Sequence, residues 1–96
     1  MKTKTQDPKF YIEDDHLVGQ SGQVPEDEPL FILRARDVNA LALLCDYKAM
    51  AKQNGANADH LRAIDIRIGD FAVFAAQHPE RMKVPDTDLS RLGKVS

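Results

Sequence analysis

The order of apolar and polar positions divides the chain into three zones. Residues 1–28 are polar and acidic, apart from two apolar islands at residues 10–12 and 17–18. Residues 29–79 hold an apolar run and two long helix-patterned stretches, and residues 80–96 form a polar tail. This pattern predicts a single domain with its core in the central zone. The two islands fit either edge strands of a small sheet or segments that pack across the helices.

The central zone begins with a continuous apolar run at residues 30–33. The run has the length of a strand and is bounded by Pro29 and by the Arg34-Ala35-Arg36 step. We interpret it as a short buried strand. An early helical turn is the alternative, because periodicity alone does not separate the two.

Helical patterning fills residues 38–54 and roughly residues 58–78, with a break at Gly55 between them. Asp37 and Asn57 stand directly before the two stretches, where their side chains can accept hydrogen bonds from first-turn amides. Gly55 can adopt the left-handed conformation that ends a helix. Because so short a connection joins the helices, they should lie antiparallel. The predicted fold class is α+β, with short N-terminal strand segments packed on a two-helix hairpin.

Both helices carry more apolar surface than one interface between them can bury. On the second helix the main core stripe comprises Leu61, Ile64, Ile68, Phe71, Ala72 and Ala75. The first helix has one stripe of Leu43, Leu44, Tyr47, Met50 and Ala51 and another of Val38, Leu41, Cys45 and Ala49. Either the N-terminal strand segment or a second subunit covers the remaining face, and the two arrangements are compatible. Because a domain this small is marginal alone, we expect a homo-oligomer.

Composition limits the classes of partner and the cellular setting. A formal charge of −2 and a pI near 5.8 give no overall attraction to nucleic acid or anionic lipid. The single cysteine, Cys45, allows no intrachain disulfide. The first residues contain no apolar signal-peptide core, and no apolar stretch is long enough to span a bilayer. We expect a cytoplasmic protein that binds neither membrane nor DNA.

No residue pattern in the chain indicates catalysis or metal binding. His60 and His78 lie too far apart on the second predicted helix to share a metal ion, and His16 lies in a loop. Arg62 and Arg67 each precede an aspartate by three residues, Asp65 and Asp70, which is the spacing of ordinary surface ion pairs on a helix. The sequence therefore predicts a non-enzymatic protein without a cofactor or a metal site.

An anion site is the one chemical function that the arginines suggest. On a strand, Arg34 and Arg36 would point to the same face and lead to the exposed amides of the first helix. Arg62 and Arg67 could supply further guanidinium groups for a phosphate. The alternative is structural: Arg36 pairs locally with Asp37, and Arg34 covers a sheet edge.

Residues 25–37, Pro-Glu-Asp-Glu-Pro-Leu-Phe-Ile-Leu-Arg-Ala-Arg-Asp, carry a resemblance to known proteins. Preceded by Gly-Gln-Ser-Gly and followed by Val-Asn-Ala, this stretch resembles a signature of small accessory proteins of bacteriophages and prophages. The resemblance covers roughly residue 19 to the end of the helical hairpin. It implies a phage context in the cytosol of a host cell, and it transfers no catalytic residue.

The resemblance also implies a function, since small phage proteins of this kind often counteract host defence by binding. The leading hypothesis is sequestration of a nucleotide signal by arginine clamps and a stacking ring. The residues assigned to this site are Phe31, Arg34, Arg36, Tyr47, Arg62 and Arg67. A second subunit would complete the pocket. The alternative is capture of a host protein through the acidic N-terminal zone or the second apolar face.

Overall fold

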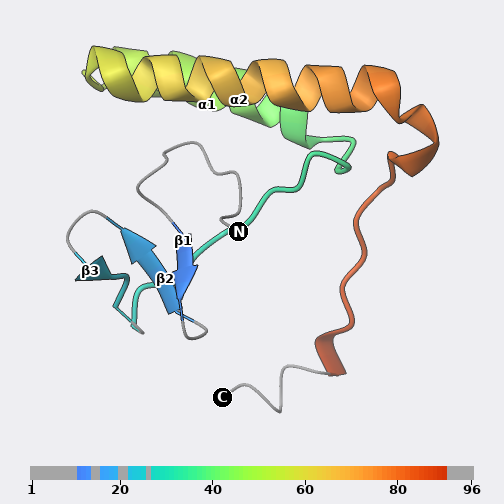
Figure 1. Ribbon diagram of the computed structural model, residues 1–96, viewed down its shortest axis with the longest axis horizontal. Helices are drawn as coiled ribbons and strands as arrows, with labels where there is room; N and C mark the ends of the chain where they lie inside the picture. The colour runs from blue at the N-terminus through green and yellow to red at the C-terminus, as the bar shows by residue number, and fades with distance from the viewer. Residues whose placement is uncertain (1–10, 14–15, 20–21, 26, 91–96) are drawn as a thin grey trace.

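The computed structural model of the protein describes residues 11–13, 16–19, 22–25 and 27–90 (Figure 1). Its elements are three short strands, two helices and one 3-10 turn. They are β1 (Tyr11–Glu13), β2 (His16–Gly19), β3 (Gly22–Gln23), α1 (Ala40–Gln53), α2 (Ala58–Gln77) and η1 (Pro79–Arg81).

The predicted antiparallel two-helix hairpin is present, and its connection follows from local chemistry. Gly55 has a φ of 84°, in the left-handed region where a residue with a side chain would be strained. The side chain of Asn57 accepts a hydrogen bond from the His60 amide at 2.8 Å and so caps α2. The second helix ends before Pro79, which cannot continue it.

The first helix begins later than predicted because Asp37 is not its N-cap. The N-cap of α1 is Asn39, which makes no side-chain capping bond. The Asp37 carboxylate instead accepts the Asn39 amide at 2.8 Å, and its carbonyl accepts the Ala40 amide at 3.1 Å. Asp37 therefore forms a tight local turn that delivers the chain into the helix.

The helices pack through a narrow seam. On α2, Ile64 is 1% exposed, and the predicted stripe around it is half-buried except for exposed Ala72. The face of α1 towards this seam lies between the two predicted stripes; its half-buried residues are Leu41, Leu44, Lys48 and Ala51. Lys48 belongs to the seam because its ammonium lies 2.6 Å from the Asp65 carboxylate on α2.

The chain after α2 returns to the segment that precedes α1. The Lys83 amide donates to the Arg36 carbonyl at 2.9 Å, and the Val38 amide donates to the Lys83 carbonyl at 3.1 Å. These two bonds form a parallel bridge between Asp37 and Lys83. The guanidinium carbon of Arg81 lies 4.7 Å from the centre of the Phe74 ring, which holds the turn against the helix. These contacts join the two chain segments at the end of the hairpin opposite the Gly55 connection (Figure 1).

The predicted α+β fold with strand segments packed on the hairpin is wrong. The strands form their own antiparallel sheet in the order β1-β2-β3, and no strand contacts α1 or α2 among the described residues. Residues 30–33, interpreted from sequence as a buried strand, belong to no strand or helix. Phe31 is 84% exposed and Ile32 80% exposed. Among the described residues, the helical hairpin packs as a unit separate from this sheet.

Neither helix in the described part of the chain is long and apolar enough to cross a membrane. The hydrophobic residues buried within the described ranges are Val18, Ala40 and Ile64. So small a buried set leaves many large apolar side chains on the surface. These exposed side chains bear directly on what the molecule can bind.

Candidate functional site: a basic hollow before the first helix

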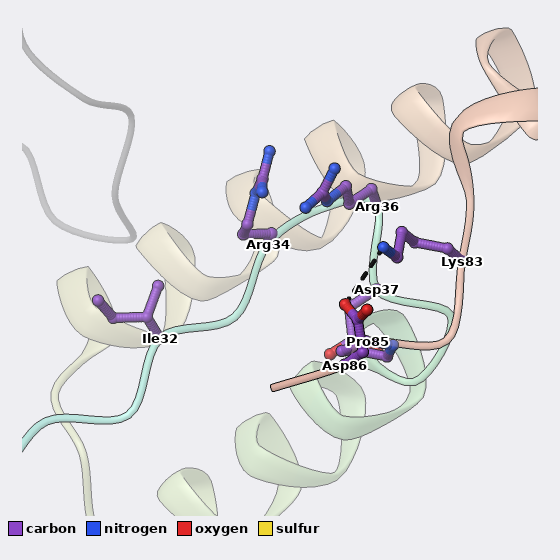
Figure 2. Close-up of a pocket in the computed structure, with 7 residues that line it drawn as sticks. All are labelled: Ile32, Arg34, Arg36, Asp37, Lys83, Pro85 and Asp86. Atoms are coloured by element: carbon purple, nitrogen blue, oxygen red, sulfur yellow. Dashed lines mark hydrogen bonds and ion pairs between the residues drawn. The ribbon is translucent and has the colours of Figure 1, made fainter. Parts of the chain in front are cut away.

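A hollow of about 230 Å³ lies where the segment before α1 meets the segment after η1 (Figure 2). We call it the basic hollow. Its lining residues are Ile32, Arg34, Arg36, Asp37, Lys83, Pro85 and Asp86. The hollow therefore joins two stretches that are far apart in the sequence.

The two arginines reach the hollow from a turn. The Asp37 amide donates to the Arg34 carbonyl at 3.0 Å, which closes a four-residue turn over Arg34 to Asp37. The parallel bridge then fixes Lys83 beside this turn. Backbone hydrogen bonds hold the two segments together, so their approach does not depend on the charged side chains that line the hollow.

The charges in the hollow are unequal. Arg34, Arg36 and Lys83 contribute three cations against the two carboxylates of Asp37 and Asp86. Both carboxylates are engaged: Asp86 lies 3.4 Å from the Lys83 ammonium, and Asp37 accepts the Asn39 amide. Figure 2 shows the guanidinium groups of the arginines at one side of the hollow and the Lys83–Asp86 pair at the other.

The guanidinium groups of Arg34 and Arg36 are the uncommitted charges of the site. Within the described residues neither has an ion-pair or hydrogen-bond partner for its side chain. Arg36 is half-buried and Arg34 is exposed. A guanidinium presents several N–H donors in a fixed plane, which suits the oxygens of a phosphate or a carboxylate.

The size of the hollow limits the ligand. Sites that enclose a drug-sized molecule have volumes of about 300–1,000 Å³. At about 230 Å³ the basic hollow is smaller than this range, so it can take a phosphate-sized group and leave the rest of a nucleotide outside. The hollow alone provides no ring for stacking.

The structure brings only two of the six residues assigned to the site into the hollow, Arg34 and Arg36. Phe31 precedes Ile32 of the lining but is itself outside it. Tyr47 lies on α1, with its hydroxyl 3.2 Å from His60 Nε2 on α2 and the two rings edge to face.

The remaining two arginines lie on α2, away from the lining of the hollow. Arg62 is exposed. Arg67 is half-buried and pairs with Asp70, as the three-residue spacing predicted. A nucleotide pocket made of all six residues is therefore not assembled within one chain.

Sequence reasoning did not assign Lys83 and Asp86 to the site. The sequence predicts only a polar tail for residues 80–96, which carry both side chains. No local sequence pattern predicts that Lys83 pairs with Arg36, because the bridge uses backbone groups that every residue except proline possesses. Pro85, two residues after the bridge, is the single feature of the tail that indicates an extended path.

Other chemistry is sparse in the described part of the molecule. No group of three or more His, Cys, Asp or Glu side chains is placed to hold a metal ion there. Cys45 is a free, exposed thiol on α1. Hydrogen bonds from the Ser90 hydroxyl and amide hold the pKa of Asp88 below its usual value.

No protein-family model matches this chain, and neither curated proteins nor solved structures include a match.

Proposed function

We propose that this protein is a small, non-enzymatic binding protein that holds the phosphate of a phosphorylated ligand in the basic hollow. The observation that carries the proposal is that two guanidinium groups without a partner among the described residues and one ammonium line a hollow that can take a phosphate group. The resemblance to phage accessory proteins implies a biological role for this binding: sequestration of a host nucleotide signal. That role remains an analogy to function in other proteins.

Arg34 and Arg36 are the principal anion ligands in this proposal, and Lys83 is the third cation. Phosphate oxygens would accept N–H bonds from the guanidinium groups, which are stronger than bonds between neutral groups. Lys83 would turn from Asp86 towards the ligand, a small change because that pair is exposed and therefore weak. Phe31, Tyr47, Arg62 and Arg67 lie outside the lining of the hollow and have no part in this proposal.

Calorimetric titration tests the proposal directly. Wild-type protein is titrated with inorganic phosphate, pyrophosphate, cyclic nucleotides and ADP-ribose derivatives. Replacing Arg34 and Arg36 by alanine should weaken binding by about 1.5–3 kcal/mol for each lost charge-assisted contact. The thermal melt should hardly change, since in the described part of the chain neither side chain has a partner whose loss would destabilise the fold.

Arg62→Ala is the matched control, because it removes the same charge from an exposed site outside the hollow. It should leave the affinity within a factor of about two, as surface charges far from a ligand act only through screened fields. An equal loss in the control would show that general charge, and not the hollow, attracts the ligand. Failure of wild type to bind any member of the panel would reject the proposal.

Capture of a host protein is the second candidate function. Leu43, Tyr47 and Met50 are 44%, 46% and 51% exposed and recur at the spacing of one helix face. Such a row of anchors is what a partner's groove accepts from a helix. The acidic N-terminal zone, the other surface considered from sequence, lies largely outside the described residues.

A photo-crosslinking residue placed at position 47 tests this candidate. It should trap the partner in host cells, whereas the same residue at position 73, which is 52% exposed on α2, should not. Equal trapping at both positions would indicate non-specific contact.

A further inference from the structure

The segment of residues 29–33 is apolar and lies outside the helices and strands. Leu30, Phe31 and Ile32 are 53%, 84% and 80% exposed. No residue of the described chain donates to or accepts from the backbone of this segment. Figure 1 shows it as a trace without strand or helix between the sheet and the hairpin. An open backbone with β-favouring side chains is a template for pairing with another extended chain.

Turns bound the open segment on both sides. The Glu28 amide donates to the Pro25 carbonyl at 3.1 Å, and the Asp37 amide donates to the Arg34 carbonyl at 3.0 Å. These bonds commit the Glu28 amide and one lone pair of the Arg34 carbonyl. The backbone available to a partner is therefore limited to residues 29–33, a short strand.

The order of charges along the chain identifies the partner. Asp27 and Glu28 precede the apolar segment, and Arg34 and Arg36 follow it. If two copies pair antiparallel, the acidic end of one lies against the basic end of the other. A parallel pairing would place like charges together, which is destabilising. The segment is thus electrostatically complementary to a second copy of itself in one orientation.

We propose that two copies of this chain associate by antiparallel pairing of residues 29–33, with Phe31 opposite Phe31 of the second copy. In this register Leu30 lies opposite Ile32, and Glu28 lies opposite Arg34. Each of these pairs occurs twice because the contact is two-fold symmetric. The pairing is between chains and involves no packing of the segment on the hairpin.

Pro29 determines whether the central pair, Phe31 with Phe31 of the second copy, is hydrogen-bonded or non-hydrogen-bonded. Pro29 has no amide N–H, so it must stand where the ladder requires none. In the proposed register it lies opposite Leu33, in the same class of pair as Phe31 with Phe31. Both are therefore non-hydrogen-bonded pairs, in which side chains approach most closely. The ladder bonds then come from Leu30 and Ile32, whose backbone groups have no partner among the described residues.

The expected dimer is weak, because a two-stranded pairing of this length is marginal in water. Small contacts of this kind belong to transient complexes. The association should therefore appear in a concentration series from micromolar to millimolar protein. Sedimentation velocity in ligand-free buffer measures it without reference to phosphate binding.

Charge exchange tests the orientation and the register. Glu28→Lys and Arg34→Glu should each weaken the dimer about tenfold, since symmetry turns one reversed pair into two repulsions. The double variant Glu28→Lys/Arg34→Glu should restore the wild-type constant. Asp59→Lys, an exposed position on α2 with the same change of charge, is the control and should have no effect.

Cysteine placement tests the central pair. In the Cys45→Ser background, Phe31→Cys should give a disulfide-linked dimer under mild oxidation, because the two thiols face each other. Ile66→Cys in the same background, at a 51% exposed site on α2, should remain monomeric. Circular dichroism melts confirm that each variant is folded.

Monomeric wild type throughout the series would overturn the proposal. Single charge reversals without effect would do the same, as would crosslinking through position 66 instead of 31. Disulfide capture of a different protein at position 31, with no dimer at any concentration, would also overturn the proposal. The double charge variant loses Arg34 from the hollow but keeps the dimer, so failure of phosphate binding and failure of pairing are separable.

Discussion

The helical hairpin and the N-terminal sheet are both built from antiparallel neighbours, yet they are held in different ways. The hairpin has a buried residue at its centre, Ile64, and contacts that join distant parts of the chain, such as the bridge from Asp37 to Lys83. The sheet consists of adjacent strands of two to four residues, with Val18 as its described buried side chain. Three short strands need a covered apolar face for independent stability.

This difference indicates that the two regions unfold separately. No contact between a strand and a helix couples them within the described residues. Denaturation measured through helical signal should report on the hairpin alone. Exchange of the sheet amides should follow local openings that have little relation to hairpin stability.

The largest expected effect comes from Ile64→Ala. Truncating this fully buried side chain should cost about 2–5 kcal/mol, enough to unfold a marginal hairpin. Helical circular dichroism should show the loss, while hydrogen exchange of the sheet amides should remain unchanged. Ile66→Ala removes the same atoms from a 51% exposed site and should cost less than about 1 kcal/mol. Faster exchange in the sheet would show that the regions are coupled.

Lys83→Pro should open the bridge at the end of the hairpin. Proline removes the amide that donates to the Arg36 carbonyl, and the expected cost is about 1–3 kcal/mol. The Val38 amide, which donates to the Lys83 carbonyl, should exchange faster. Lys83→Ala keeps the backbone bond and should leave the melt near that of wild type. Equal destabilisation by both variants would assign the effect to the side chain.

Two glycine substitutions should act in opposite directions. Gly55→Ala should destabilise the hairpin by about 1 kcal/mol, because residue 55 has a φ of 84°. Gly69→Ala should stabilise it by about 0.5–1 kcal/mol, since residue 69 lies inside α2 and an added Cβ meets nothing within 4 Å. Thermal melts measure both. Destabilisation by Gly69→Ala would indicate that its face is covered in solution.

The smallest effect concerns pH. Bonds from the Ser90 hydroxyl and amide lower the pKa of Asp88, so its contribution is present above the pKa of the unfolded chain. That contribution is lost as pH falls through the lowered folded value. Carbon NMR titration of the Asp88 carboxyl should show the lowered pKa, and Ser90→Ala should raise it. An unchanged titration in that variant would exclude the hydroxyl as the main cause.

The hairpin was predictable because its ends depend on residues close in sequence. Gly55, Asn57 and Pro79 act within one or two turns of their own positions, and the structure confirms all three. The face of α1 was not predictable in the same way. Apolar residues surround much of that helix, so periodicity could not select the seam that contains Lys48.

Residues 30–33 show the limit more clearly. The sequence of a short apolar run does not show which residues cover it. The interpretation as a buried strand requires a partner within the chain. The neighbouring arginines lie near each other simply because they are two residues apart. Lys83 is brought beside them by a backbone bridge that has no sequence signal, so three of the seven residues that line the hollow could not be predicted.

The bridge between Asp37 and Lys83 also decides where the chain enters and leaves the hairpin. Because the two residues are adjacent in space, the two ends of the stretch between them are also adjacent. Segments with adjacent ends are those that tolerate transplantation into a surface loop of another protein. The stretch from 36 to 83 includes the Arg36 carbonyl that accepts the Lys83 amide, so grafting it would carry α1, α2 and the complete bridge as one piece.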